Sequence, residues 1–471
     1  MSLPPQFDEP ALRGLRRVEA ALDRGQSHVF RVLWFMIPSG SVAWNLQFQA
    51  LLASRFLSDI AVQALLYGAL IATVSGGGNE VDAALLGTAY LLPGVIFAMY
   101  GGALADALPK RIALAGAYLA MGLLCLLIPS LFGTGFRSLL FVILAVRALH
   151  QLSQPSEASA VPLVANREEL ASATSFISFA SSTGEVIGKA LLAPLLVQAW
   201  GVNPVIILAG LLFFLSSSRV FKLQTRPMHV VRGGPDERIE SRISTRAALD
   251  YLIAEPGVLW MLLLAAMAST VNVVLGVLGP QYVQSVLDVE PANAVYVFAP
   301  APIGLVVALA LAPMFIGMAG ERIVAAVGFG LVAVAGTALG LVQPLVDHAE
   351  WLLFFDIPGV GAKVEMAALM SIFLGAGMTF AAAAAQTFVT RNVPLEIQGR
   401  TNALLGMLKD GLAIPSLLLM GAIAGVVGVG TVITVSPVLL LASALFVDRY
   451  SARWRVGASA NRILRHGREK R

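Results

Sequence analysis

The sequence predicts an all-α integral membrane protein with twelve transmembrane helices in two six-helix bundles. Of its 471 residues, 57% are hydrophobic and only 13% are charged, whereas a soluble globular protein carries about 25% charged residues. Apolar runs of about 20 residues, long enough to cross a bilayer, recur along the chain between segments of Gly, Pro or charge. The longest charged stretch, Arg219 to Glu255, follows the sixth run and divides the chain into two halves of six.

The predicted spans have approximate bounds. In order they are residues 48–74, 82–104, 112–132, 138–158, 172–197, 203–220, 257–284, 292–316, 322–342, 364–388, 401–426 and 430–448. The predicted domains are a cytoplasmic or interfacial N-terminal segment (1–47), an N-terminal bundle (48–221), a cytoplasmic linker (222–256), a C-terminal bundle (257–448) and a basic cytoplasmic tail (449–471).

The segment before the first span is amphipathic. Leu15, Val18 and Leu22 lie among arginines, which is typical of a helix on the membrane surface. The apolar run that ends at Pro38 is too short to span a bilayer. We therefore expect residues 29–47 to be interfacial, and no small-residue cleavage site follows that would indicate a signal peptide.

The distribution of basic residues predicts the orientation. With the N-terminus in the cytoplasm, 26 of the 32 Lys and Arg residues lie in cytoplasmic segments, 2 in external loops and 4 within spans. Such an excess is typical of the cytoplasmic side. We expect a multi-pass protein of the bacterial inner membrane with both termini in the cytoplasm. The net charge of +4 reflects this topology, and no nucleic-acid partner is expected.

Composition and spacing argue against several kinds of site. The single cysteine, Cys125, gives no disulfide framework, cysteine-based zinc site or iron–sulfur cluster, and the five histidines are too scattered to indicate a metal site. Residues 184–190 resemble a phosphate loop, but they are one residue short and lack Ser or Thr after Lys189, so no ATP binding is predicted. No Ser/His/Asp pattern indicates an intramembrane enzyme.

The two halves show a weak internal repeat. An offset of 227 residues aligns Glu169 and Leu170 with Glu396 and Ile397, Thr174 with Thr401, and Gly184 with Gly411. Both segments run from a predicted cytoplasmic loop into a span. Together with the equal number of spans, this favours a parallel duplication, which places a substrate site between the halves.

The segment between the second and third spans reads Gly101-Gly102-Ala103-Leu104-Ala105-Asp106-Ala107-Leu108-Pro109-Lys110-Arg111. It resembles the signature loop of the major facilitator superfamily, Gly-x-Leu-Ala-Asp followed by a basic pair, in the place where that family has it. The resemblance covers nearly all of residues 48–448 and implies the major facilitator fold, with alternating access by rocking of two bundles and no ATP site. It also implies a cytoplasmic gate of Gly102, Asp106, Lys110, Arg111 and Arg400. The alternative is a tight turn whose basic residues only set the topology.

Other segments resemble the exporter and lysophospholipid-transporter branch of that family. They are Phe56-Leu57-Ser58, Ala64-Leu65-Leu66-Tyr67, Gln154-Pro155 and Gln398-Gly399-Arg400-Thr401-Asn402. The sequence departs from the branch at Val62, where an acidic residue is usual; here the carboxylate lies one turn earlier, at Asp59. It also has Gly188-Lys189 where antiporters have Gly-Pro.

The fifth predicted span carries a polar face. Its members, spaced by 3, 4, 3 and 4 residues, are Ser175, Ser178, Ser182, Glu185 and Lys189. An ionisable residue inside a membrane is a candidate functional residue, so this face is predicted to line a cavity in which Glu185 takes a proton or contacts a cation. The alternative is that Glu185 and Lys189 neutralise each other and only pack between helices.

The first span carries Arg55, Asp59 and Gln63 at intervals of four residues. We predict that Asp59 is a protonation site, and the alternative is a salt bridge with Arg55 at the cytoplasmic end of the span. In the eleventh span, Lys409 and Asp410 are adjacent and face different directions, so they are interpreted as structural.

The fourth span places Arg147, Gln151 and Gln154 on one stripe, with His150 and Glu157 beside it. Arg147 is predicted to bind a carboxylate or an anionic headgroup through two hydrogen bonds. The alternative is that Arg147 pairs with a carboxylate of the first or fifth span.

These features predict a secondary transporter that exports an amphipathic or lipophilic small molecule against proton entry, with no cofactor besides the proton gradient. Asp59 and Glu185 are the predicted proton-coupling residues. The predicted substrate cavity comprises Gln63, Arg147, Gln151, Gln154, Ser178, Ser182 and Lys189. The expected partners are a small or lipid-like solute and membrane lipids, and a monomer suffices. The alternatives are a lysophospholipid flippase that needs no proton gradient, and a receptor or assembly subunit that transports nothing.

Overall fold

The computed structural model of the chain describes residues 42–97, 110–165, 169–221, 255–349, 361–393, 395–443 and 445–446. Each predicted span coincides with helix within these ranges, and none of the residues in them lies in a strand. Ten of the described helices are long and apolar enough to cross a membrane. The other two predicted spans are the fifth, which changes helix type midway, and the last, which is the shorter apolar helix Val429–Ser443. The predicted twelve-helix membrane fold is confirmed.

The helices follow the two predicted halves. The N-terminal half contains η2 (Val42–Trp44), α2 (Leu46–Ser75), α3 (Glu80–Phe97), α5 (Lys110–Phe132), α6 (Phe136–Val164), α7 (Leu170–Val186), η4 (Ile187–Leu192), α8 (Ala193–Trp200) and α9 (Val202–Phe221). The C-terminal half contains α11 (Pro256–Ser285), η5 (Pro291–Asn293), α12 (Ala294–Phe298), α13 (Ala301–Ala319), α14 (Glu321–Gly340), α15 (Val342–Ala349), α16 (Ala362–Asn392), α17 (Leu395–Val427) and the helix Val429–Ser443. The short helix α15 was not predicted from the sequence.

Two spans depart from a regular α-helix. Between α7 and α8 the chain forms η4, six residues of π-helix that include Lys189. Single π-helical turns inside α-helices are frequent at functional sites. The eighth span is broken between α12 and α13 at Ala299 and Pro300, where proline lacks the N–H group that a continuous helix requires.

Left-handed glycines end some of the helices. Gly201 follows α8 and Gly320 follows α13, each with a φ of 83°. Glycine adopts this region without the steric cost that a Cβ brings. This explains why glycines mark the ends of apolar runs in the sequence.

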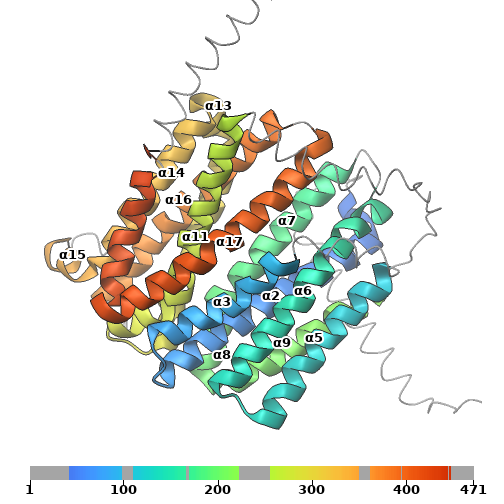
Figure 1. The fold of residues 1–471 in the computed structure, drawn as a ribbon, viewed down its shortest axis with the longest axis horizontal. Coiled ribbons are helices and arrows are strands. Elements are labelled where there is room, and N and C mark those ends of the chain that lie inside the picture. The colour runs from blue at the N-terminus through green and yellow to red at the C-terminus, as the bar shows by residue number, and fades with distance from the viewer. Residues whose placement is uncertain are drawn as a thin grey trace, which may run out of the picture.

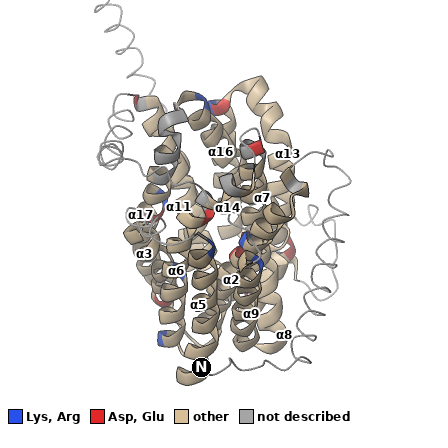
Figure 2. Cartoon of the chain, turned by 90° about the vertical axis from the view of Figure 1, so that its right-hand side faces the viewer, with Lys and Arg blue, Asp and Glu red and all other residues tan. Residues whose placement is uncertain are grey.

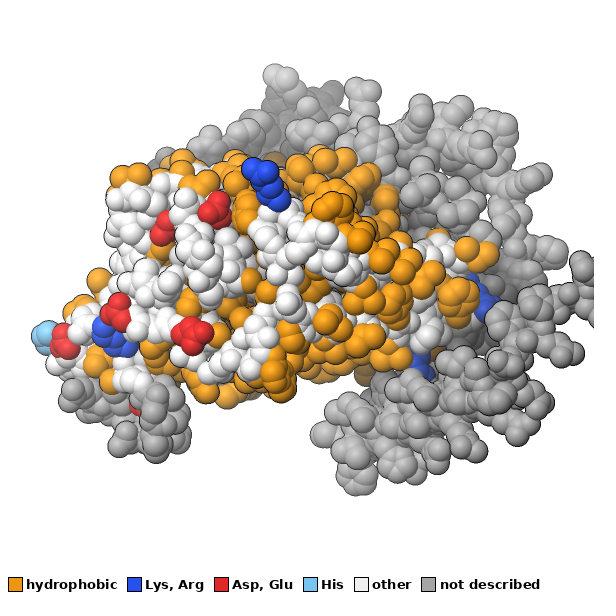
Figure 3. Space-filling view, turned by 90° about the horizontal axis from the view of Figure 1, so that it is seen from below, with side chains coloured by type: hydrophobic (Ala, Val, Ile, Leu, Met, Phe, Trp, Pro, Cys, Tyr) orange, Lys and Arg blue, Asp and Glu red, His pale blue; other side chains and the backbone are white. Residues whose placement is uncertain are grey.

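The outside of the bundle is apolar. Few residues along the helices are Lys, Arg, Asp or Glu, as the colours of Figure 2 show. Hydrophobic side chains cover the middle of the face in Figure 3, with several charged side chains toward one end of it. Large exposed hydrophobic residues include Phe132, Trp200, Met318 and Val426. Such extensive apolar exposure is unfavourable in water, so this surface suits the hydrocarbon of a bilayer.

The two halves lie side by side, as the blue-to-green and yellow-to-red parts of Figure 1 show. Three helix pairings recur in both: α5 with α6 and α14 with α16, α3 with α6 and α13 with α16, and α2 with α7 and α11 with α17. These pairs join the third and fourth, the second and fourth, and the first and fifth spans of each half. The linker that would separate the halves, residues 222–254, lies outside the described residues, so the predicted domain boundaries stay a prediction.

The halves meet along α3 and α17 and at one end of the bundle. At the end away from the start of α2, Gln198 Nε2 donates to Asn293 Oδ1 (2.9 Å) and Gln281 Nε2 donates to the Gly78 carbonyl oxygen (3.4 Å). At the opposite end, Ser178 on α7 is exposed. Among the described residues, the hydrogen bonds that join the halves therefore lie at one end. The end where α2 and α7 begin, with Ser178 exposed, is called the open end below.

Several predicted features lie outside the described residues. These are the interfacial segment, of which residues 1–41 are not described, and the gate residues Gly102 and Asp106. The side chains of Lys110, Arg400 and Ser175 are likewise not described. The guanidinium of Arg111, the remaining gate residue, lies 5.7 Å from the centroid of the Phe221 ring. The gate stays a prediction.

Candidate functional site

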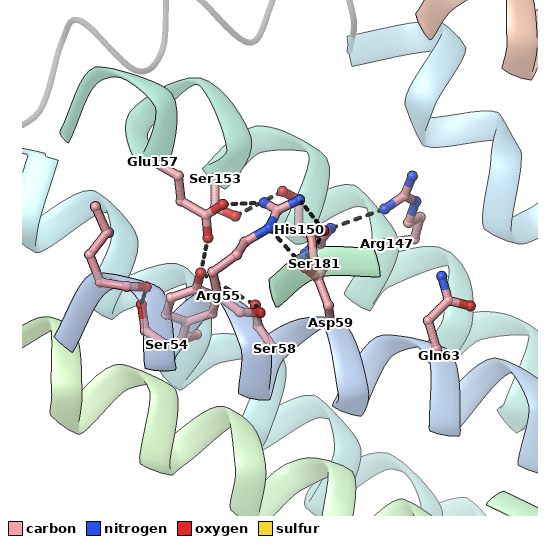
Figure 4. Close-up of polar contacts among 12 residues, drawn as sticks. Ser54, Arg55, Ser58, Asp59, Gln63, Arg147, His150, Ser153, Glu157 and Ser181 are labelled. Atoms are coloured by element: carbon pink, nitrogen blue, oxygen red, sulfur yellow. Dashed lines mark hydrogen bonds and ion pairs between the residues drawn. The ribbon is translucent and has the colours of Figure 1, made fainter. Parts of the chain in front are cut away.

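Buried charges gather where α2, α6 and α7 meet (Figure 4). Arg55 lies between two carboxylates, with its Nε 2.8 Å from Asp59 Oδ2 and its Nη1 donating to Glu157 Oε2 on α6. The spacing of four residues places Arg55 and Asp59 on one face of α2. The salt bridge that the sequence offered as the alternative interpretation of Asp59 is present.

Further donors surround Asp59. Ser181 Oγ on α7 donates to Asp59 Oδ2 over 2.6 Å, and His150 Nε2 on α6 lies 3.5 Å from Asp59 Oδ1. Arg147 Nη1 lies 3.0 Å from His150 Nδ1. Because a guanidinium offers only donors, Nδ1 is the acceptor in a neutral imidazole. The proton of His150 is then on Nε2, facing Asp59.

The second carboxylate has a different neighbour. Tyr118 on α5 hydrogen bonds to Glu157 Oε1, and Ser58 Oγ lies 3.5 Å from the Tyr118 hydroxyl. All three residues are buried. A tyrosine hydroxyl both donates and accepts, so this neighbour suits either an ionised or a protonated carboxyl group.

Close packing of α2 against the fifth span brings these groups together. A Cβ at Gly184 would lie 2.9 Å from the Phe56 carbonyl oxygen, and one at Gly188 would lie 2.5 Å from the Ile60 carbonyl oxygen. A side chain at either position would force the helices apart, whereas small residues let membrane helices approach closely. The two glycines therefore permit the reach of Ser181 to the carboxylate on α2.

The positive and negative charges of the buried group, Arg55, Asp59 and Glu157, do not cancel. With both carboxylates ionised, Arg55, Asp59 and Glu157 carry one net negative charge, which Arg147 balances through His150. A charged side chain at the bilayer centre costs about 2.5–3.5 kcal/mol on insertion scales. One proton on either carboxylate changes this balance by a full charge, so proton binding strongly affects the free energy of the group.

A cavity of about 210 Å³ lies beside the group. Its lining residues are Leu51, Arg55, Gln154, Glu157, Val161 and Ile177. Leu51, Val161 and Ile177 lie between the group and the helix ends at the open side of the bundle. The cavity has room for water and polar partners to hold it.

A second set of polar residues lies where the halves face each other. The Arg147 guanidinium stacks 4.5 Å from the centroid of the Tyr90 ring on α3, and Gln63 Nε2 donates to the Tyr90 hydroxyl over 3.0 Å. Asp410 on α17 is within electrostatic range of Arg147. A Cβ at Gly94 on α3 would lie 2.0 Å from Asp410 Oδ2. Asp410, which the sequence led us to interpret as structural, therefore faces the opposite half.

The polar face of the fifth span borders the same interface. Lys189 Nζ lies 3.1 Å from Glu185 Oε1, and the two side chains are 29% and 44% exposed. The self-neutralised pair offered as the alternative interpretation is present. Ser178 and Ser182 are exposed, and Lys409 of the opposite half is within electrostatic range of Glu185. This face is open toward the C-terminal half.

The structure connects some of the predicted site residues and separates others. One chain of contacts runs from Asp59 through His150, Arg147 and Tyr90 to Gln63. Glu185, Lys189, Ser178 and Ser182 lie outside this chain, on the exposed face of the fifth span; Gln154 lines the cavity and Gln151 is half-buried on α6. The functional roles of these residues stay predictions.

The structure lacks one contact that the sequence offered for Arg147, and it shows contacts of residues that the sequence did not single out. Among the described residues Arg147 forms no ion pair with a carboxylate, so its alternative pairing with the first or fifth span is not found. Ser181, Tyr118 and Tyr90 were missed, because uncharged hydroxyl groups give no distinct signal in an apolar span. No group of three His, Cys, Asp or Glu residues in the described ranges is placed to hold a metal ion.

Comparisons with known proteins agree with this architecture. Residues 51–414 match the Major Facilitator Superfamily. The nucleoside transporter NupG has a similar structure (TM-score 0.63, 13% identity, 86% of this chain and 100% of that chain), as does a D-xylose-proton symporter (0.64, 13%, 86% and 97%). A bacterial homolog of the human lysosomal transporter Spinster, inward-facing and occupied, is also similar, with a TM-score of 0.60 and 16% identity over 86% of this chain and 96% of that chain. No curated protein sequence matches the chain.

Proposed function

The chain belongs to the major facilitator superfamily, and from this we propose that it is a proton-coupled secondary transporter that exports an amphipathic or lipophilic solute by alternating access. Family membership supports secondary transport. Export is supported by the segments that resemble the exporter branch, such as Phe56-Leu57-Ser58 in α2. The proposal includes a monomer in the bacterial inner membrane with both termini in the cytoplasm.

The shared guanidinium of Arg55 carries the proposal of proton coupling. One cation serves two buried carboxylates, Asp59 and Glu157, inside helices that cross the membrane. A site of this kind binds one proton with a large change in electrostatic free energy, because the hydrocarbon screens charge poorly. Glu185 is the weaker coupling candidate, since Lys189 already neutralises it and both side chains are only partly buried.

The difference between the two ends of the interface supports the proposal of alternating access. With the termini in the cytoplasm, the open end faces the cytoplasm and the hydrogen bond of Gln198 to Asn293 closes the outside. The solute enters against the exposed face of α7 and contacts Arg147 and Gln63. Antiport requires that the halves rock when either a proton or a solute is bound. The predicted gate of Asp106, Lys110, Arg111 and Arg400 then closes the cytoplasmic side.

Flux in proteoliposomes tests the proposal. A lipophilic dye and a fluorescent lysophospholipid are compared with and without an imposed pH gradient, in the wild type and in Asp59→Asn, Glu157→Gln and Glu185→Gln. We expect gradient-driven dye flux to fall at least tenfold in the first two variants, because each removes one charge from the buried group.

The matched control is Asp288→Asn. Asp288 is an exposed carboxylate with a φ of 57°, a conformation that asparagine also adopts, and this variant should transport normally. Full gradient-driven flux in an Asp59→Asn, Glu157→Gln double variant would overturn the proposal.

A lysophospholipid flippase is the second candidate. The observation that favours it is Arg147, whose Nε is buried without a hydrogen-bond partner and whose guanidinium lies near the interface of the halves. Such a group suits an anionic headgroup. Lipid movement that ignores the pH gradient would favour this function. Zero flux of every solute would instead favour a receptor or assembly subunit.

A further inference from the structure

We propose that Glu157, and not Asp59, carries the coupling proton, that Tyr118 holds this proton in place, and that the cavity beside Glu157 delivers it from the open end of the bundle. The assignment rests on the proposed function, because a coupling proton exists only in a proton-coupled transporter. It adds a residue that the sequence did not single out and gives Asp59 a different role.

Asp59 is surrounded by donors. Arg55 Nε, Ser181 Oγ and His150 Nε2 all face its two oxygens, at 2.8, 2.6 and 3.5 Å. An ionised carboxylate only accepts hydrogen bonds, whereas a protonated one must also donate one. Arg55 Nε and the protonated Nε2 of His150 can only donate. The Ser181 hydroxyl can also accept, as it does from Arg55 Nη2 over 3.4 Å, but among the described residues its own hydrogen has no acceptor besides Asp59. These neighbours therefore favour an ionised Asp59.

Glu157 has a neighbour that can reverse its role. When Glu157 is ionised, the Tyr118 hydroxyl donates to Oε1. When a proton binds to Oε1, this O–H donates to the Tyr118 oxygen, and the Tyr118 hydrogen turns toward Ser58 Oγ, 3.5 Å away. Ser58 accepts it, because its own hydrogen already goes to the Arg55 carbonyl oxygen at 2.9 Å. No covalent bond breaks besides the one that released the proton from water.

The two carboxylates also differ in their access to the cavity. Glu157 lines the cavity of about 210 Å³ together with Arg55 and Gln154, whereas Asp59 does not line it. The cavity walls toward the open end are Leu51, Val161 and Ile177. Water in this cavity reaches Glu157 without passing Arg147 or the exposed face of α7, so the proton and the solute take different routes.

The charges around Glu157 explain the consequence of protonation. The groups that face it are Arg55 and Asp59 of α2 and Tyr118 of α5, whereas His150 of its own helix, α6, faces Asp59. Once Glu157 is neutral, Arg55 is matched by Asp59 alone. The ion pair on α2 is then complete, and the tie from α2 to α6 through Arg55 is weakened. This frees α6 to move relative to α2 during rocking.

An infrared experiment tests the assignment without transport. The carbonyl band of a protonated carboxyl group is followed against pH in nanodiscs that contain the purified protein. We expect a band that Glu157→Gln removes, that Tyr118→Phe shifts in frequency, and that Ser181→Ala leaves unchanged. Ser181→Ala perturbs Asp59 without removing a charge. A band that persists in Glu157→Gln and shifts in Ser181→Ala would overturn the assignment.

Flux measurements supply the second test. Glu157→Gln resembles the protonated state, because its amide donates to Tyr118, so downhill solute exchange should continue while gradient-driven accumulation falls at least tenfold. Filling the cavity with Val161→Phe should slow proton movement, read from a pH dye inside the vesicles, with exchange unchanged. Loss of both activities in Glu157→Gln would contradict the proposed role.

Tyr282→Phe is the matched control for Tyr118→Phe. It also removes a buried hydroxyl, one that donates to the Leu339 carbonyl oxygen over 2.7 Å in the C-terminal half, and it should keep gradient-driven accumulation.

If the infrared band is assigned to Glu157 but no flux depends on the gradient, the proposed function fails and the protonation site stands. If flux is coupled but the band belongs to another residue, only the assignment fails.

Discussion

Replacing Gly188 with alanine tests whether the contact between η4 and α2 supports the buried charged group. The added Cβ would lie 2.5 Å from the Ile60 carbonyl oxygen, 2.9 Å from Gln63 Cβ and 3.0 Å from the Ala64 nitrogen. Ordinary contact begins near 3.4 Å, so the helices must separate by roughly 1 Å because backbone atoms cannot rotate away. Overpacking of this kind costs about 1–3 kcal/mol.

Gly116→Ala is the matched control, since nothing lies within 4 Å of a Cβ at that position in α5. Both variants add a single Cβ to a helical glycine, and only the one at Gly188 meets backbone atoms, so the difference in stability between them reports the clash. We expect Gly188→Ala to be less stable than Gly116→Ala by about 1–3 kcal/mol.

Thermal unfolding is followed with a thiol-reactive dye, because the single cysteine, Cys125, is 1% exposed and reacts only when the bundle opens. Gradient-driven transport should fall in Gly188→Ala as well, because the Ser181–Asp59 hydrogen bond is lengthened. A Gly188→Ala protein that melts at or above the temperature of Gly116→Ala would refute the reasoning.

Three further predictions concern the interface. Gln198→Ala removes a hydrogen bond to Asn293 worth about 0.5–1.5 kcal/mol; spin labels on α8 and η5 should show a broader distance distribution, and an unchanged one would contradict the closed-end contact. Glu185→Gln and Lys189→Gln should leave the melting temperature, read from Cys125, nearly unchanged, since a partly exposed pair of this spacing contributes about 0.3–0.5 kcal/mol; a large drop would make the pair structural. Arg147→Gln should weaken solute binding without a gradient by about 10- to 150-fold, because hydrogen bonds to charged groups are worth about 1.5–3 kcal/mol; equal affinity would exclude it from the solute site.

Run length and composition sufficed to predict the spans, because a bilayer fixes both the length and the apolar character of each helix. They did not predict η4. A π-turn leaves the apolar pattern unchanged, and its position depends on the packing of Gly188 against α2. The broken eighth span has a local signal in Pro300, but prolines are also tolerated inside membrane helices.

Within the site, contacts between residues of one helix could be predicted from the sequence, and contacts between different helices could not. Arg55 with Asp59, and Glu185 with Lys189, follow from a spacing of four residues. The bond from Arg55 to Glu157 joins residues 102 positions apart, and it depends on how α6 is rotated against α2. Glu157 was noted beside the polar stripe of α6, but its own helix gave no reason to prefer it.

The buried charges lie in only one half of a repeated architecture. In the described part of the C-terminal half, the buried polar residues are all uncharged: Thr270, Gln281, Ser371, Thr401 and Ser436. Arg55, Asp59, His150 and Glu157 all come from residues 48–221, so the contacts of the group among the described residues do not depend on the sequence of the C-terminal half. A chimera that keeps residues 48–221 and takes a different C-terminal half is therefore expected to retain the buried group.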